Sequence, residues 1–267
     1  GPAGENLVKI AGVMCDIYHT AARGGLGAVM GSKNVKAIGT TGKKALEVCD
    51  IERFMEAAEE ARQSIDSNGS CQFYKEDGTA GVIMSVNESK ALPNENFRRG
   101  YLKDAYKISG QCLTEQGYLV RRESCFACNI SCKRYTETRE KYLGSAAGGP
   151  EYENLGSLGA ATLVVDMDAN LRANELCNIY GLDAISTGST IAWAMETASH
   201  KLLPSTFEDP ETGKTIRLEW GSSEALLALI VMIAKRQGLG DLLAEGVKRA
   251  SEKVGGDSWK WAIHAKG

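Results

Sequence analysis

Three cysteines stand close together in the segment ESCFACNISCKR, at Cys125, Cys128 and Cys132. A spacing of two and then three intervening residues lets one short loop wrap three thiolates round a single centre. Zinc sites usually have two separated pairs of cysteines, and the radical type of iron–sulfur protein has the reverse spacing. The pattern favours a [4Fe-4S] cluster with a remote fourth cysteine, and zinc or a set of unligated thiols are the alternatives.

The remaining cysteines are isolated, and an isolated cysteine is more often a small buried residue than a ligand. They are Cys15, Cys49, Cys71, Cys112 and Cys177. A chain of 267 residues with 43% apolar residues can form its own core without disulfides, so we expect a reducing, cytoplasmic location. Lys133 and Arg134, which follow the third cysteine, either offset an anionic cluster or form a solvated surface pair.

Composition excludes several classes of protein. The 31 Lys and Arg against 34 Asp and Glu give a net charge of -3, so no basic field favours nucleic acid or anionic lipid. Apolar runs such as residues 225–234 fall short of the roughly 20 residues that a membrane span needs. The start, GPAGENLVKI, has neither an initiator Met nor the pattern of a signal peptide. We expect a soluble protein whose chain has been cut at its start.

Two regions of the chain differ in pattern. Residues 1–42 hold the β-like runs LVKIAGVM and VKAIGT on either side of the glycine-rich ARGGLGAVMGSK, and we place a boundary near residue 43. Asp50 is the expected N-cap of an amphipathic helix over residues 51–65, and residues 66–114 are turn-rich. Apolar periodicity then predicts helices over residues 153–164, 168–180, 186–199, 222–237 and 241–254.

Five blocks of the sequence resemble one family, the tungsten-containing aldehyde:ferredoxin oxidoreductases. In chain order they are RGGLGAVMGSKNVKAI (23–38), CFACNISC (125–132), GPEYENLG (149–156), NIYGLDAISTG (178–188) and HAKG (264–267). The resemblance implies an α+β fragment. Residues 1–42 would be the C-terminal end of a β-rich, pterin-binding N-terminal domain, and residues 43–267 largely α-helical domains truncated at the C-terminus. The fourth cluster cysteine is then expected beyond residue 267.

The resemblance also implies cofactor contacts. Cys125, Cys128 and Cys132 would hold the [4Fe-4S] cluster. The expected pterin contacts are Arg23, Gly24, Gly25, Asn178, Gly181, Leu182, Asp183 and Lys266. Glycine backbone can approach a pterin closely, and the Arg23 guanidinium offers donors, although GLG alone would also suit a dinucleotide loop. Asn178 departs from the family pattern, which often has Asp there.

Asp183 is expected on a turn after Gly181, where its carboxylate can accept hydrogen bonds from a pterin ring; the alternative is a plain helix C-cap with a solvated Asp. For proton transfer near the metal we favour Glu153, with Glu151 as the competitor, together with His264. His19 and His200 receive no role.

By resemblance, the protein oxidises a small-molecule aldehyde to a carboxylate at a bis-pterin tungsten, or molybdenum, centre. Electrons pass through the [4Fe-4S] cluster to ferredoxin or an iron–sulfur partner subunit. One alternative is the catalytic subunit of a tungsten-dependent benzoyl-CoA reductase, which belongs to the same family. Another is a cluster-only electron-transfer module, which would not need the pterin-contact blocks. We expect an anaerobic host, an oligomer in the full-length form, and a fragment that is inactive alone.

Overall fold

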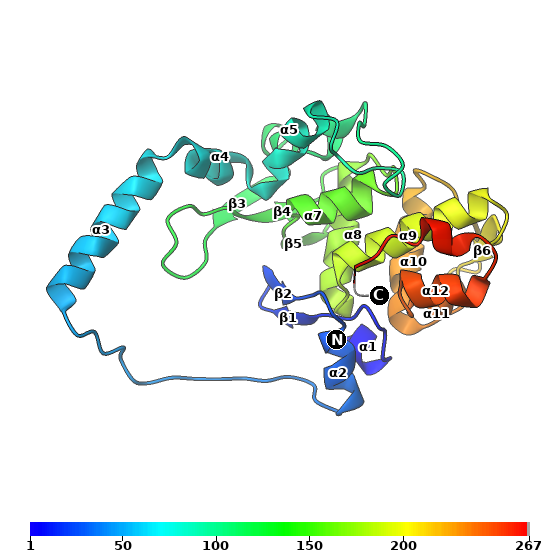
Figure 1. Cartoon of the computed structure of the whole chain (residues 1–267), viewed down its shortest axis with the longest axis horizontal. Coiled ribbons are helices and arrows are strands. Elements are labelled where there is room, and N and C mark those ends of the chain that lie inside the picture. Colours follow the sequence, from blue (N-terminus) through cyan, green and yellow to red (C-terminus); the bar gives the residue numbers. More distant parts are fainter. Residues whose placement is uncertain (266–267) are drawn as a thin grey trace.

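The computed structural model describes residues 1–265, in which helices dominate and the strands form small antiparallel sheets (Figure 1). The expected α+β class is confirmed. A hairpin near the N-terminus pairs β1 (Val13–Cys15) with β2 (His19–Ala21). A second sheet has the order β3 (Leu119–Glu123), β4 (Lys133–Glu137) and β5 (Ala146–Gly148). A third joins β6 (Thr206–Glu208) to β7 (Thr215–Arg217).

The helices of the first half are short, except for one. They are α1 (Pro2–Glu5), α2 (Leu26–Ser32), α3 (Ile51–Ser67), α4 (Gly69–Asp77), α5 (Val82–Glu88) and α6 (Gly110–Glu115). The second half has α7 (Tyr152–Asn154), α8 (Met167–Tyr180), α9 (Ala184–Ser199), α10 (Ser223–Lys235), α11 (Leu239–Leu243) and α12 (Val247–Val254). A π-helical turn, Leu155–Ala160, follows α7.

The main apolar core lies among α8, α9 and α10, with α1 and the segment after it packed against them. The sequence of α10, SEALLALIVMIAK, is apolar on almost every side, which is typical of a helix enclosed by neighbours. Trp193 of α9 is fully buried, and its indole N–H donates to the Ser258 carbonyl at 2.9 Å. Within residues 1–265, no helix is both long and apolar enough to cross a membrane.

The longer helices predicted from the sequence are confirmed as α8, α9 and α10, with small shifts at their ends. The single helix expected over 241–254 is divided into α11 and α12, because Gly246 has a left-handed φ of 79° between them. The helix expected over 153–164 is instead the short α7 followed by the π-helical turn. The turn-rich region 66–114 contains α4, α5 and α6, which the sequence did not indicate.

The strand expected from VKAIGT is wrong. Residues 35–49 carry no regular secondary structure, and a strand needs a hydrogen-bonded neighbour to form. This segment runs extended from α2 to α3, which stands away from the body of the molecule (Figure 1). The helix expected after the Asp50 cap is confirmed as α3, with the Asp50 side chain accepting from the Arg53 N–H.

Glycines allow α1 and α2 to pack closely. A Cβ on Gly4 would lie 2.7 Å from the Gly27 carbonyl oxygen, and one on Gly31 would collide with the Gly4 carbonyl oxygen. Part of the glycine-rich segment therefore serves helix packing rather than contact with a ligand.

Candidate active site

The three clustered cysteines lie on the loop 124–132 that joins β3 to β4. The Cys128 N–H donates to the Cys125 carbonyl at 3.1 Å, and Ala127 and Ser131 have left-handed φ values of 56° and 55°. This irregular backbone is what a short loop needs to turn several side chains towards one centre. We refer to residues 124–132 as the thiol loop.

Arg134 fastens the thiol loop to α4. Its side chain is 1% exposed, and its guanidinium donates to the Ser131 and Lys133 carbonyls at 3.2 Å. The same group donates to the Tyr74 and Lys75 carbonyls near the end of α4, at 3.1 and 2.9 Å. Burial, and then the charge of Arg122, lower the pKa of Arg134. Arg134 is therefore a buried clamp and not part of a solvated surface pair.

All three thiols of the loop are free; Cys125 is exposed and the other two are half-buried. Burial raises the pKa of the Cys132 thiol, and Glu151 adds to this while Lys133 opposes it. Cys125 and Cys128 are near enough to raise that pKa further. Within residues 1–265, no three His, Cys, Asp or Glu side chains converge tightly enough for one metal ion. Three free thiols on one loop suit a cluster, in which the thiolates bind different irons.

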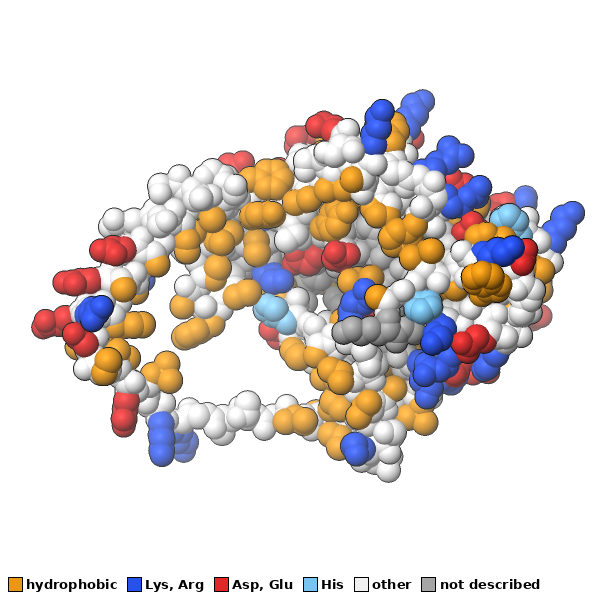
Figure 2. Space-filling model, in the orientation of Figure 1, with side chains coloured by type: hydrophobic (Ala, Val, Ile, Leu, Met, Phe, Trp, Pro, Cys, Tyr) orange, Lys and Arg blue, Asp and Glu red, His pale blue; other side chains and the backbone are white. Residues whose placement is uncertain are grey.

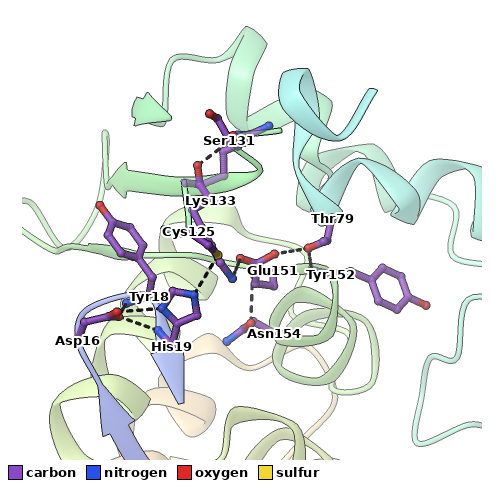
Figure 3. A network of polar contacts seen from close by, with 12 residues as sticks. Asp16, Tyr18, His19, Thr79, Cys125, Ser131, Lys133, Glu151, Tyr152 and Asn154 are labelled. Carbon is purple, nitrogen blue, oxygen red and sulfur yellow. Dashed lines mark hydrogen bonds and ion pairs between the residues drawn. The ribbon is translucent and has the colours of Figure 1, made fainter. Parts of the chain in front are cut away.

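Lys133 and Glu151 form an ion pair of 3.1 Å beside the thiol loop (Figure 3). Burial disfavours the ammonium, but the Glu151 carboxylate outweighs this and raises the pKa of Lys133. The other Glu151 oxygen accepts from the Thr79 hydroxyl, and Glu151 also caps α7 through a reciprocal pair with Asn154. Of the two candidate carboxylates, Glu151 is thus engaged by neighbours, whereas Glu153 is exposed on α7.

A cavity of about 440 Å³ brings together three of the blocks that were singled out in the sequence. Arg23, Gly24 and Gly25 line it, and so do His264 and residues of α9. Further cationic side chains come from Lys9 and Arg249, and hydroxyls from Ser186, Ser189 and Thr190. Such a lining suits a ligand that carries phosphate. Figure 2 shows that basic, acidic and histidine side chains are spread over the visible face of the molecule.

Gly24 and Gly25 serve different purposes at this cavity. Both have left-handed φ values, 106° and 73°. A Cβ on Gly25 would lie 2.5 Å from the Lys9 carbonyl oxygen, so packing requires glycine there. A Cβ on Gly24 would meet no heavy atom within 4 Å. The backbone at Gly24 therefore borders open space, where a flat ring system can approach it closely.

Asp183 begins α9 and is buried at 1% exposure, so it is not the solvated residue of the alternative interpretation. Its carboxylate accepts from the N–H groups of Ile185 and Ser186 at 3.1 and 3.2 Å. Arg23 reaches the same carboxylate, with its Nε 3.6 Å from Oδ2. The Asp183 carboxylate therefore already accepts from donors within the chain, and it lies beside Arg23, which lines the cavity.

The other expected contacts are dispersed. Gly181 ends α8 with a left-handed φ of 77°, and the Leu182 side chain is buried in the core. The Asn178 amide donates to the Gly148 carbonyl at 3.4 Å, on the side of β5. His264 lines the cavity, and Lys266 lies outside the described residues. The structure thus places Arg23, Gly24, Gly25 and His264 together, but not Leu182 or Asn178.

His19 is a residue of this region that the sequence did not indicate. Its Nε2 lies 3.3 Å from the Cys125 sulfur, and its Nδ1 lies 2.9 Å from an Asp16 carboxylate oxygen (Figure 3). The contact with Cys125 joins residues 106 positions apart. No local pattern could have marked it.

Known proteins resemble the chain over almost its whole length. The tungsten-containing aldehyde ferredoxin oxidoreductase of Pyrococcus furiosus is 41% identical over 259 residues, 96% of this chain and 41% of that protein. The protein of the same name from Thermococcus kodakarensis is 39% identical, over 98% of this chain and 42% of its own length. The chain therefore spans about two fifths of the length of these relatives.

A solved structure shares the fold. The active-site complex BamBC of benzoyl coenzyme A reductase, in complex with 1,5-dienoyl-CoA, matches 98% of this chain and 40% of its own chain, with a TM-score of 0.77 and 23% identity. Two family models also match in succession. Residues 1–42 match the N-terminal domain of aldehyde ferredoxin oxidoreductase, and residues 56–267 match its domains 2 and 3. The chain belongs to the aldehyde ferredoxin oxidoreductase family.

Proposed function

We propose that the complete protein oxidises a small-molecule aldehyde to a carboxylate at a bis-pterin tungsten centre and passes the electrons through a [4Fe-4S] cluster to ferredoxin. The observation that carries the proposal is the cavity, where Arg23, Gly24 and His264 meet at the start of α9. The names of the relatives, which are about 40% identical, support the metal and the substrate class. Molybdenum is the alternative metal.

The cavity provides what a phosphate-bearing pterin needs. The guanidinium groups of Arg23 and Arg249 and the Lys9 ammonium offer charged donors, and the hydroxyls of α9 offer neutral ones. Gly24 leaves its backbone accessible for close approach. When bound, the tungsten centre would supply the two-electron oxidation, while the protein orients the substrate and manages its protons.

Two groups are proposed for proton handling. His264 lines the cavity, so its imidazole can give or take a proton near a bound substrate. Glu153 is exposed, which leaves its carboxylate available to water, whereas Glu151 is held by Lys133 and the Thr79 hydroxyl. We therefore keep Glu153 as the proton carrier and assign Glu151 to the support of the thiol loop.

The thiol loop is the proposed exit for electrons. Cys125, Cys128 and Cys132 would supply three of the cluster ligands, and the adjacent Lys133 ammonium would offset part of their negative charge. Ferredoxin or an iron–sulfur partner subunit would accept the electrons. Free thiols and an exposed cluster ligand suit the reducing cytoplasm.

The test combines metal analysis with substrate turnover of the complete protein after anaerobic purification. We expect about one tungsten and about four irons per chain, with aldehyde-dependent reduction of ferredoxin. Iron without tungsten or molybdenum would favour the cluster-only module, and zinc alone would overturn the cluster. Turnover of an aromatic coenzyme A thioester in place of aldehydes would assign the protein to ring reduction instead.

A further inference from the structure

His19 connects the N-terminal hairpin to the thiol loop. Its Nε2 is 3.3 Å from the Cys125 sulfur, within hydrogen-bond range for sulfur, and its Nδ1 is 2.9 Å from the Asp16 carboxylate. Figure 3 shows the ring standing between these two groups, with the Lys133 and Glu151 pair on the far side of the sulfur. Asp16, His19 and the expected cluster ligand Cys125 thus form a continuous chain of polar contacts.

The hairpin turn holds His19 in this position. Asp16 has a left-handed φ of 65°, and one of its carboxylate oxygens accepts from the N–H groups of Tyr18 and His19 at 2.6 and 2.9 Å. The tip of the hairpin also packs on β5, because a Cβ on Gly148 would lie 2.6 Å from the Tyr18 ring. The imidazole is therefore set by backbone geometry and by packing, and not only by its own contacts.

Both neighbours of the His19 ring are hydrogen-bond acceptors. A carboxylate is an acceptor, and a thiolate bound to iron is also an acceptor. Donation to the sulfur requires the N–H on Nε2, and Nδ1 could donate to Asp16 at the same time only in a doubly protonated, cationic ring. Donors to the sulfurs of an iron–sulfur cluster are one of the means by which a protein sets its reduction potential. They favour the reduced cluster, which carries one more negative charge.

We propose that His19, oriented by Asp16, donates a hydrogen bond to the Cys125 sulfur of the bound cluster and thereby raises the reduction potential of that cluster. This inference rests on the proposed [4Fe-4S] cluster. His19 is a tuning residue and not a ligand. It belongs to the segment 1–42, whereas the thiols belong to the part of the chain that follows.

The test is a redox titration of the cluster, followed by electron paramagnetic resonance, in the complete protein. His19→Phe keeps an aromatic ring but removes both ring nitrogens. His19→Gln keeps a side-chain N–H donor near the position of Nε2. His200→Gln is the matched control, because His200 stacks on Trp261 at 4.0 Å, outside the thiol loop. Iron is counted in every variant before the titration, which separates loss of the cluster from a change in its potential.

With iron retained, we expect His19→Phe to raise the ratio of oxidised to reduced cluster about tenfold at the wild-type midpoint, equivalent to about 59 mV for one electron. His19→Gln should recover most of the change, and His200→Gln should cause none. Should the Phe variant lose iron, Asp16→Asn provides the test, with a smaller shift in the same direction. An unchanged midpoint in the iron-replete variants would overturn the proposal. A strong coupling of ¹⁴N to the cluster in the wild type would do so too, since His19 would then be a ligand. Wild-type protein without iron would refute the proposed cluster itself.

Discussion

The Arg23 guanidinium lies 3.6 Å from the Asp183 carboxylate, although the two residues belong to parts of the chain that match different domains of the family. The Arg23 side chain is 54% exposed, whereas that of Asp183 is 2% exposed; because backbone N–H groups also hold the Asp183 carboxylate, the pair is expected to contribute no more than about 1 kcal/mol to stability. Its main contribution is therefore expected to be to ligand binding. The cavity that Arg23 lines is where this contribution can be measured.

Arg23→Met should change the free energy of unfolding by less than about 1 kcal/mol and yet lower the tungsten content per chain. The measurements are chemical denaturation and elemental analysis. Arg217→Met is the control, because Arg217 is 75% exposed on β7 and pairs with Glu219 outside the cavity. Full tungsten occupancy in the Arg23 variant would remove Arg23 from the cofactor site.

Cys128→Ser should lower the iron content and abolish electron transfer to ferredoxin, since a serine oxygen is a poor ligand for an iron–sulfur cluster. Cys49→Ser provides the comparison, because Cys49 is free and exposed outside the thiol loop. Iron and ferredoxin reduction are measured in both variants. Unchanged iron in the Cys128 variant would contradict the cluster assignment.

Arg134→Lys should lower the free energy of unfolding by about 2–4 kcal/mol, because lysine cannot reach four carbonyls at once and leaves buried acceptors without donors. Denaturant titration gives the value. The exposed neighbour across the ladder offers the control, and Arg122→Lys should stay within about 0.5 kcal/mol of the wild type. Equal effects of the two changes would show that Arg134 is no clamp.

Glu153→Gln should retain tungsten and stability but lose turnover, since the amide cannot carry a proton. Glu151→Gln should instead lower the free energy of unfolding by about 1–2 kcal/mol, because the half-buried Lys133 loses its charged partner. Steady-state kinetics and denaturation separate the two. If Glu151→Gln alone abolishes turnover with tungsten retained, Glu151 is the proton carrier.

Acid should weaken the fold partly through Glu245. Burial raises the pKa of Glu245, but the hydrogen bond and charge of Arg236 outweigh burial and hold it below its usual 4.5. Because the folded-state pKa is depressed, this contribution is complete well above pH 4.5 and is lost as the pH falls through the folded-state value.

Glu245→Gln should therefore cost about 1–2 kcal/mol near neutral pH, and the difference from the wild type should vanish at strongly acidic pH. Denaturation across the pH range gives both quantities. Glu252→Gln, at an exposed position of α12, should show no such trend. A difference that stays constant with pH would mean that the Arg236 contact does not depend on the carboxylate charge.

The sequence predicted best what depends on local pattern. The α8, α9 and α10 helices follow apolar periodicity and caps, and Asp50 caps α3 as expected. The segment VKAIGT has the composition of a strand, but no described partner offers it a ladder, so composition alone misled. The short helices between residues 66 and 114 have too few turns for a periodic signal to develop.

Contacts between residues far apart in the chain could not be predicted from local sequence patterns. From the sequence, Arg134 was either a counter-charge to an anionic cluster or part of a solvated surface pair, and only its buried position against α4 shows that it binds carbonyls. No sequence motif surrounds His19, and its proposed role depends on its contact with the Cys125 thiol on another loop. Asp183 was noticed for a carboxylate on a turn, whereas the fold uses it first to begin α9 and to hold Arg23.

One stretch of chain carries His19 to the thiol loop and Arg23 to the cavity. Four residues of polypeptide span no more than about 14 Å, so the covalent chain between His19 and Arg23 keeps the two regions close together. As long as His19 contacts Cys125 and Arg23 lines the cavity, this link limits how far the thiol loop and the cavity can move apart. Inserting one residue between His19 and Arg23 would lengthen this link by at most about 3.6 Å and shift one of the two side chains away from its present contacts.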